Sequence, residues 1–268
     1  MAQAQQIPVV MTFSGHDPSG GAGIQADIEA LAGVGCHAAP VVTAITVQDT
    51  RDVARVEPLA AELVAAQARA VLADLPVAAF KIGLLGSIAV AAAVQQVVAE
   101  RPHLPLVLDP ITAAGGGAEL ADDALLEALR RLLPRVTLLT PNSHEARRLA
   151  PAAADLDGCA AELLARGCAW VLVTGTHESG DAVVNRLYGG DGTVSARSWP
   201  RLDPSYHGSG CTLAAACAGL LAHGHDPRRA VAAAQAFTWE SLRHGRRPGH
   251  GQHLPDRFFW AAAARGRR

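Results

Sequence analysis

The chain has 268 residues, of which 50% are hydrophobic, and a formal net charge of −2. Charges of both signs are interspersed and only 4% of the residues are aromatic, so we expect no binding of nucleic acid. Gly, Pro or charged residues interrupt each apolar stretch well before about 18 residues, and residues 1–6 have no basic segment, so we expect a soluble, untargeted, cytoplasmic protein that binds no membrane. Because no linker or repeat marks a boundary, one domain over residues 1–268 is expected.

Cysteine and lysine usage narrows the chemistry further. The five cysteines are odd in number and show no CxxC spacing, which argues against a disulfide framework or a zinc site and favours a reducing compartment. Lys81 is the only lysine, and it does not stand in a GxxxxGK(S/T) motif. A nucleoside triphosphate would therefore be bound without a P-loop.

The first third of the chain alternates between strand and helix patterns. Residues 9–14 are predicted to form a buried strand, which ends in a glycine-rich loop at 15–23 and continues into a helix. That loop lacks GxGxxG, which argues against an NAD-dependent oxidoreductase. Residues 39–47 are rich in β-branched side chains and predict a second strand, after which Pro58 is predicted to start an alanine-rich helix.

The alternation continues through the middle of the chain. Strands are predicted at 78–82, 106–109, 136–140 and 170–174, and helices at 87–100, 122–133, 144–149 and 158–165. Such alternation indicates right-handed crossovers, and hence a mainly parallel sheet with helices on both faces. Ligands of these folds bind at the carboxyl ends of the strands.

The last third begins with a hairpin pattern. Residues 182–188 and 193–199 flank a Gly-Gly-Asp-Gly turn, which predicts an antiparallel hairpin toward one edge of the sheet. Helices are predicted at 212–223, at 227–243 and from Pro255 onward.

A second glycine-rich turn, His207 to Cys211, runs directly into a helix that is apolar on every side. Glycines allow a close approach of the backbone, and the free amides and positive dipole end of a helix attract anions. The turn of Gly208, Ser209, Gly210 and Cys211 is therefore a candidate phosphate cradle, although a plain tight turn is the alternative. Cys211 is a candidate general base whose thiolate the helix start should favour, or else a small buried cysteine.

Several polar residues follow predicted strands, where a site is expected. Asp109, Asn142 and Glu145 would supply ligands for the Mg²⁺ ion that phosphoryl transfer requires, in part through water. Asp17 follows the first strand and Gln48 the second. The alternatives are structural: Asp17 and Asn142 as helix caps, Asp109 as a turn residue and Glu145 as a first-turn carboxylate.

Six segments, spread over nearly the whole chain, form a combined pattern: SGHDPSGGAGIQAD at 14–27, TAITVQDT at 43–50, KIGLL at 81–85, VLDP at 107–110, TPNSHEA at 140–146 and HGSGCT at 207–212. Together they resemble the hydroxymethylpyrimidine/phosphomethylpyrimidine kinases of thiamine biosynthesis, within the ribokinase-like superfamily. The resemblance implies a three-layer αβα sandwich with the hairpin at one edge. It implies transfer of the γ-phosphate of ATP to 4-amino-5-hydroxymethyl-2-methylpyrimidine, and then to its monophosphate.

Residue roles follow from the same resemblance. Gly15, Asp27, Gln48 and Leu84 would form the pyrimidine site, with Leu84 standing where a methionine is frequent. Asn142 and Glu145 match the NxxE element associated with Mg²⁺, and Gly208 to Cys211 match the anion hole. The ATP co-substrate would contact Asp109 and the segment at Thr174 and Gly175, where many relatives have Lys-Gly-Gly-His, so a lysine contact to phosphate is missing here.

Other functions stay open at this point. The nearest alternative is a pyridoxal or pyridoxine kinase of the same superfamily, since that substrate also carries a hydroxymethyl group on an aromatic nitrogen ring. A non-catalytic metabolite or nucleotide sensor is the alternative from another class, against which Asp109, Glu145 and Cys211 argue. A homodimer is a possible assembly that the resemblance suggests.

Overall fold

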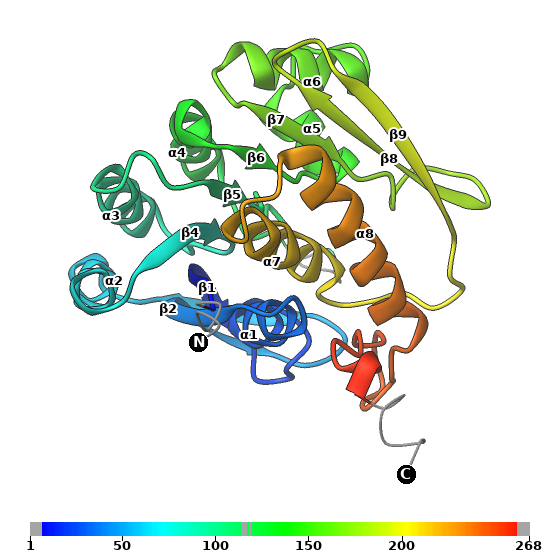
Figure 1. The fold of residues 1–268 in the computed structure, drawn as a ribbon. Coiled ribbons are helices and arrows are strands. Elements are labelled where there is room, and N and C mark those ends of the chain that lie inside the picture. The colour runs from blue at the N-terminus through cyan, green and yellow to red at the C-terminus, as the bar shows by residue number, and fades with distance from the viewer. Residues whose placement is uncertain (1–6, 114–116, 118, 262–268) are drawn as a thin grey trace, which may run out of the picture.

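One mixed β-sheet runs through the centre of the molecule (Figure 1). The computed structural model describes residues 7–113, 117 and 119–261, and within them the sheet has nine strands in the order β3-β2-β1-β4-β5-β6-β7-β8-β9. The strands are β1 (Val9–His16), β2 (His37–Gln48), β3 (Val53–Pro58), β4 (Val77–Ile82), β5 (Leu106–Leu108), β6 (Leu138–Leu139), β7 (Trp170–Val173), β8 (Ala182–Gly189) and β9 (Val194–Pro200).

The middle of the sheet is parallel and both its edges are antiparallel. Strands β2, β1, β4, β5, β6 and β7 pair in parallel, β3 pairs antiparallel with β2, and β8 and β9 form an antiparallel hairpin beside β7. β1 and β5 are buried along almost their whole length. Continuous apolar strands of this kind require helices on both faces of the sheet.

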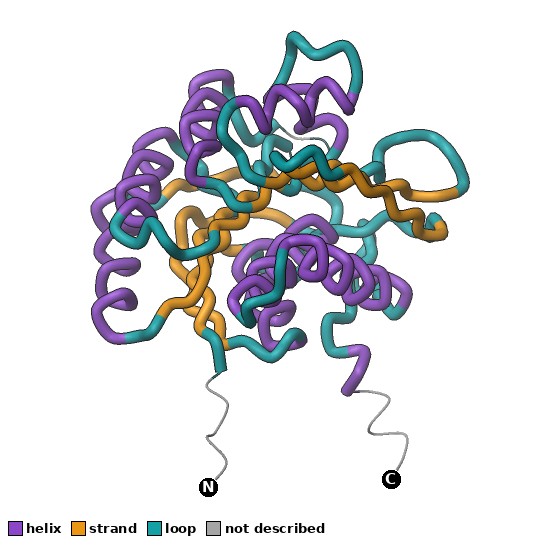
Figure 2. The backbone as a smooth tube through the Cα atoms, turned by 45° about the horizontal axis from the view of Figure 1, so that its top comes forward, coloured by secondary structure: helices purple, strands orange, loops and turns teal. Residues whose placement is uncertain are grey.

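Helices cover the two faces unequally (Figure 2). On one face α1 (Gly23–Gly33), α7 (Ser209–Ala222) and α8 (Pro227–Arg243) pack over a core that includes Leu31, Val107 and Leu213. The other face is covered by α2 (Ala61–Asp74), α3 (Ile88–Ala99), α4 (Asp123–Leu132), α5 (Ser143–Leu149) and α6 (Leu156–Ala165), with the short 3₁₀ helix η1 (Leu133–Arg135). The result is the predicted three-layer αβα sandwich with its hairpin at one edge.

The antiparallel strand β3 was not predicted. Its side chains are exposed or half-buried because it forms an edge of the sheet, so it lacks the apolar signal of a buried strand. Pro58 ends this strand, and α2 begins at Ala61, so the expectation that Pro58 starts a helix was wrong. The helix predicted from Pro255 was wrong at its start, because residues 255–258 are not helical and the helix begins at Phe259; residues 262–268 lie outside the described residues.

Helix α7 is buried on all sides and packs against β1, β4 and β5. Its first residue is Ser209. The turn at Gly208 lies at the carboxyl ends of the central parallel strands, because Gly208 packs against Gly21, which follows β1, and Gly210 lies near Asp109, which follows β5. No helix in the described ranges is long and apolar enough to span a membrane. The packing of α7 fixes the direction in which the amides of its first turn point.

Candidate active site

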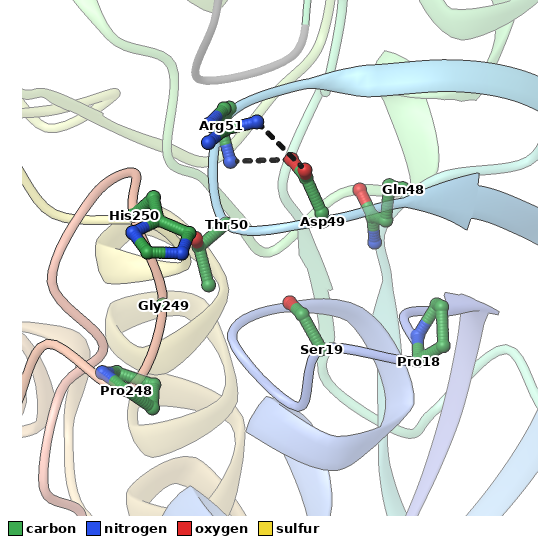
Figure 3. A pocket seen from close by; sticks show the side chains of 9 residues that line it. All are labelled: Pro18, Ser19, Gln48, Asp49, Thr50, Arg51, Pro248, Gly249 and His250. Atoms are coloured by element: carbon green, nitrogen blue, oxygen red, sulfur yellow. Dashed lines mark hydrogen bonds and ion pairs between the residues drawn. The ribbon is translucent and has the colours of Figure 1, made fainter.

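A pocket of about 350 Å³ lies at the carboxyl ends of β1 and β2 (Figure 3). Three segments line it: the loop after β1, the turn from β2 to β3, and a loop near the C-terminus. The lining residues are Pro18, Ser19, Gln48, Asp49, Thr50, Arg51, Pro248, Gly249 and His250. In Figure 3 the Gln48 amide points toward the loop that carries Pro18 and Ser19. Gln48, which is predicted to bind the pyrimidine, therefore lines a cavity large enough for a small molecule.

Asp17 organises the glycine-rich loop after β1. Its Oδ1 atom accepts hydrogen bonds from the amide and the hydroxyl of Ser19, both at 2.8 Å, and its Oδ2 atom accepts one from the Ala22 amide at 2.7 Å. The Nε2 atom of His207 lies 3.1 Å from the same Oδ2 atom. Burial alone would raise the pKa of Asp17, but the bonds from His207, Ser19 and Ala22 outweigh it and lower that pKa to about 2. Asp17 thus links the loop after β1 to His207, the residue that precedes the predicted phosphate-binding turn at residues 208–211, called the phosphate turn below.

Two of the predicted pyrimidine-site residues are in contact. A Cβ atom on Gly15 would lie 2.9 Å from the Cδ2 atom of Leu84, so the glycine makes room for this leucine. Leu84 is buried, and the hydroxyl of Thr43 donates a hydrogen bond to its carbonyl oxygen. The ends of β1, β2 and β4 are tied together here.

Asp27 lies deeper than the pocket. Its carboxylate forms an ion pair with the Nζ atom of Lys81 at 2.8 Å and accepts a hydrogen bond from the Ser14 hydroxyl at 2.7 Å. Both charged side chains are fully buried. Burial opposes a charge on Lys81, yet Asp27 raises the pKa of this lysine above its ordinary value. Asp27 therefore lies beneath the site, and Lys81 is its buried partner.

The phosphate turn depends on the conformation of Gly208. This residue is the N-cap of α7 and has a left-handed backbone with φ +82°. A Cβ atom at Gly208 would lie 1.9 Å from the carbonyl oxygen of Gly21, so only glycine fits. Gly210 is exposed in the first turn of α7, and the first amides of a helix lack intrahelical partners. The turn therefore presents free amides at an open surface beside the loop after β1.

Cys211, the third residue of α7, is buried, and the ionisation of its thiol differs from the expectation. Burial raises the pKa of the Cys211 thiol to about 12, although Lys81 opposes the shift. The expectation that the helix N-terminus would favour the thiolate was therefore wrong. Burial of the thiol disfavours its charged form more strongly than the helix N-terminus favours it.

Asp109 and Glu145 place two buried carboxylates near the start of α7. A Cβ atom on Gly210 would lie 3.8 Å from both carboxylate oxygens of Asp109. Burial raises the pKa of both acids, and for Glu145 the charge on Asp109 raises it further. The Oδ2 atom of Asp109 is buried without a hydrogen-bond partner in the part of the chain that is described. Such an orphaned oxygen, next to a second carboxylate, fits a divalent cation held through oxygen ligands and water.

Asn142 and Glu145 also form a capping box. The Asn142 side chain accepts a hydrogen bond from the Glu145 amide at 2.9 Å, and the Glu145 side chain accepts one from the Asn142 amide at 2.8 Å. The structural alternative for this pair is therefore present in the molecule. It directs one carboxylate oxygen of Glu145 to the Asn142 amide, and a backbone hydrogen bond from Thr112 also favours the ionised form of this acid. Within the described residues, no group of three or more His, Cys, Asp and Glu side chains could hold a metal ion alone.

Comparison with known proteins gives the family. The model of the family described as phosphomethylpyrimidine kinase matches residues 17–256. A protein of Synechococcus elongatus named hydroxymethylpyrimidine/phosphomethylpyrimidine kinase is 38% identical over 259 residues, which cover 94% of this chain and 98% of that protein. The chain belongs to the phosphomethylpyrimidine kinase family.

Solved structures show the same fold. A phosphomethylpyrimidine kinase from Clostridium difficile 630 is 30% identical, with a TM-score of 0.76 over 88% of this chain and all of that one (100%). The pyridoxal kinase from Staphylococcus aureus in complex with AMP-PCP and pyridoxal is 26% identical, with a TM-score of 0.86 over 95% of both chains. Shape alone thus fails to separate the pyrimidine kinases from the pyridoxal kinases, whereas sequence places this chain with the former.

In this member of the phosphomethylpyrimidine kinase family, the segment after β7 lies beside the start of α5. Thr174 pairs with Asn142 through an isolated parallel bridge, which puts the predicted nucleotide segment beside the predicted metal residues. Gly175 is confined because a Cβ atom there would lie 2.3 Å from the carbonyl oxygen of Val184. The ring of His177 stacks on that of His144, with centroids 4.6 Å apart. His177, three residues after Thr174, thus brings an imidazole to this segment, whereas Thr174 itself carries no cation.

Arg201 fixes this segment and was not singled out from the sequence. Its guanidinium donates hydrogen bonds of 2.7–2.8 Å to three carbonyl oxygens, those of Thr176, Glu178 and Gly180. The His207 contact to Asp17 was likewise not foreseen. Both interactions join residues far apart in the chain, so no local pattern of residues could reveal them.

Proposed function

We propose that this protein transfers the γ-phosphate of ATP to the hydroxymethyl group of 4-amino-5-hydroxymethyl-2-methylpyrimidine and then phosphorylates the resulting monophosphate, in thiamine diphosphate biosynthesis. The observation that carries this proposal is the 38% identity, over 94% of the chain, to a protein named for both activities. One domain built on the single sheet would hold both substrates. We place the enzyme in the cytoplasm, in keeping with five free cysteines, and a homodimer remains a prediction.

The pocket at Gln48 is proposed to hold the pyrimidine. Its volume of about 350 Å³ lies within the range of small-molecule sites. The Gln48 amide has both a donor and an acceptor, so it can bond a ring nitrogen and the exocyclic amino group together. Gly15 and Leu84 would form the wall beneath the ring, and Asp27 would support that wall from below.

The phosphate turn is proposed to bind the transferred phosphoryl group. Amides at Ser209, Gly210 and Cys211 would donate to its oxygens, aided by the positive end of the α7 dipole. Asp109 and Glu145 would hold Mg²⁺ in part through water, with Asn142 orienting Glu145. When bound, Mg²⁺ would neutralise phosphate charge. The segment at Thr174 and Gly175 would support the nucleotide.

Cys211 is proposed to take part in removing the proton from the acceptor. Burial raises the pKa of its thiol to about 12, so a role as base requires deprotonation at high pH or on substrate binding. Phosphoryl transfer passes through a loose transition state in which charge neutralisation and positioning supply most of the catalysis. Cys211 as a base would therefore supply only a small part of the rate enhancement.

One assay tests the proposal against its main alternative. Purified protein is given Mg·ATP with hydroxymethylpyrimidine, its monophosphate or pyridoxal, alongside the Cys211→Ala and Cys211→Ser variants. We expect turnover of both pyrimidines and a loss of about 10²-fold in the alanine variant. Turnover of pyridoxal alone would assign the protein to vitamin B6 salvage, the alternative raised by the 0.86 TM-score to a pyridoxal kinase. ATP binding without any turnover would favour a sensor.

A further inference from the structure

Arg257 is a buried arginine that lies next to the phosphate turn. Its side chain is only 1% exposed, although it stands near the C-terminus and one residue beyond the segment matched by the family model. Its Nε atom donates to the Thr212 hydroxyl at 2.8 Å, and its Nη1 atom lies 3.0 Å from the Glu29 carboxylate. Its Nη2 atom donates to the carbonyl oxygen of Gly21. The three nitrogens therefore contact three separate segments of the chain.

The contact to Thr212 leads directly to Gly208. The Thr212 hydroxyl, which accepts from Arg257, donates to the carbonyl oxygen of Gly208 at 2.8 Å. A Cβ atom on Gly208 would lie 3.0 Å from the Nη2 atom of Arg257, so the guanidinium packs against the glycine itself. Arg257 thus holds the left-handed turn by both a hydrogen-bond relay and direct packing.

The contact to Gly21 leads to the loop after β1. A Cβ atom on Gly21 would lie 2.5 Å from the His207 ring and 2.7 Å from the Leu254 side chain, so this loop, the phosphate turn and the C-terminal segment pack without space between them. Only a planar guanidinium presents donors in three fixed directions; an ammonium group on a flexible chain does not. The geometry therefore requires an arginine at this position and not merely a positive charge.

We propose that Arg257 is a positioning residue that locks the phosphate turn and the loop after β1 into one geometry, acting through Thr212 and the carbonyl of Gly21. The inference rests on the proposed role of residues 208–211 as a phosphate cradle. Arg257 touches no substrate in this scheme. Its effect is to aim the amides of the first turn of α7 before a phosphate arrives, which lowers the cost of reorganisation during the reaction.

The hydroxyl of Thr212 gives the sharpest test, because Thr212→Val removes the relay without changing the shape of the side chain. Thr212→Ser keeps the hydroxyl. Thr238 supplies a matched control, since its buried hydroxyl donates to the carbonyl four residues earlier at 2.8 Å, the same local bond that Thr212 makes. Thr238→Val therefore reports the general cost of removing such a bond from a buried helix.

We expect Thr212→Val to lower kcat about 10-fold with little change in the KM for the pyrimidine, whereas Thr212→Ser and Thr238→Val stay within about 2-fold of wild type. Arg257→Lys should lose about as much as Thr212→Val or more. The dissociation constant of Mg·ATP, measured by calorimetry, and the amide NMR signals of Gly208 and Gly210 provide readouts that need no turnover. Thr212→Val should weaken Mg·ATP several-fold and shift both signals.

The outcomes separate the two proposals. If wild type binds Mg·ATP but phosphorylates neither pyrimidine, the proposed function fails, while a weaker affinity in Thr212→Val still supports the role of Arg257. If Thr212→Val equals Thr238→Val in kcat, in Mg·ATP affinity and in the signals of Gly208 and Gly210, Arg257 only anchors the C-terminal segment and the inference is overturned. If wild type does not bind Mg·ATP, the turn is no phosphate cradle and the inference falls with it.

Discussion

The Nζ atom of Lys81 lies 2.8 Å from the Oδ1 atom of Asp27, and neither side chain has any exposed surface. Removing one member of a buried ion pair leaves an uncompensated charge, which is much more costly than losing a surface pair. We therefore expect Asp27→Asn to lower the free energy of unfolding by about 3–5 kcal/mol, as measured by urea denaturation. Asp27 does not line the pocket, so the affinity for the pyrimidine should fall only to the extent that losing the ion pair disturbs the residues above it.

The surface pair of Arg55 and Glu57 provides the control for this prediction. Their side chains are 66% and 58% exposed with a 3.0 Å separation, so Glu57→Gln should cost less than about 1 kcal/mol. Replacing both buried partners, as in Lys81→Met with Asp27→Leu, should recover much of the stability lost by Asp27→Asn. A stable Asp27→Asn protein with a selective loss of pyrimidine affinity would show instead that Asp27 reaches the substrate directly.

The left-handed turn at Gly208 yields a second prediction. Gly208→Ala adds a Cβ atom 1.9 Å from the Gly21 carbonyl oxygen, at φ +82°, so both strain and a clash with backbone are introduced. We expect an at least 100-fold loss of kcat/KM, since aimed helix-start amides of this kind are typically worth 10²–10³-fold, by order of magnitude. Steady-state kinetics on folded protein would measure it.

Gly224, two residues past the end of α7, is the control for Gly208, because it has the same left-handed backbone but no atom nearby for a Cβ atom to clash with. It has φ +83°, but a Cβ atom there would meet nothing within 4 Å. Gly224→Ala should therefore cost only about 1–2 kcal/mol of stability, the price of the left-handed backbone, with activity retained. Equal losses of activity in both variants would mean that the turn at Gly208 has no special part in catalysis.

Local pattern predicted the fold well because the apolar periodicity reports burial directly. The buried run at Val9 and the apolar residues of α7 place β1 and this helix in the core, and parallel strands then bring Gln48 and Asp109 to the same edge of the sheet. Pro58 misled the prediction because proline is as acceptable at the end of an edge strand as at the start of a helix.

The parts of the site that sequence could not predict depend on packing between distant segments. His207 and Asp17 are 190 residues apart, so no spacing rule relates them. For Cys211 the sequence showed the helix N-terminus, which lowers a thiol pKa, but not the enclosure that raises this one to about 12. Desolvation is a property of the assembled structure, which explains why the sign of this shift was missed.

The bonds around Asp17 predict a pH dependence. Its folded-state pKa is lowered to about 2 from an ordinary value of 3.8, so the folded state favours the ionised form. The contribution of ionised Asp17 to the free energy of unfolding is fully present above pH 3.8, its ordinary pKa, and is lost as the pH falls toward about 2. Asp17→Asn should therefore cost on the order of 1–2 kcal/mol at pH 7, and this difference from wild type should shrink between about pH 4 and pH 2.

Urea denaturation of both proteins at several pH values measures this difference directly. Asp203, which is exposed, supplies the control: Asp203→Asn should leave the pH dependence of wild type unchanged. A difference between wild type and Asp17→Asn that stays constant down to pH 2 would show that the interactions of Asp17 do not depend on its charge.

The two buried acids beside the phosphate turn lead to a prediction for Mg²⁺. The pKa of Glu145 is raised by burial and by Asp109, so its ionisation destabilises the metal-free protein. The sign is opposite to that of Asp17: the contribution to stability is present below the unfolded pKa and is lost as the pH rises toward about 8. Glu145→Gln should therefore gain stability relative to wild type between pH 5 and pH 9 when EDTA is present.

The same substitution should weaken the response to metal. Proteins usually bind Mg²⁺ with only one or two carboxylates, directly or through water, so the loss of one carboxylate matters. Glu145→Gln should therefore raise the Mg²⁺ concentration required for half-maximal activity about 10-fold. The exposed Glu127 on α4 is the control, because Glu127→Gln changes the net charge equally without touching the site. If Glu145→Gln requires the same Mg²⁺ concentration as Glu127→Gln and wild type, Glu145 acts only through its capping box with Asn142. Asp109 would then be the remaining candidate ligand among these residues.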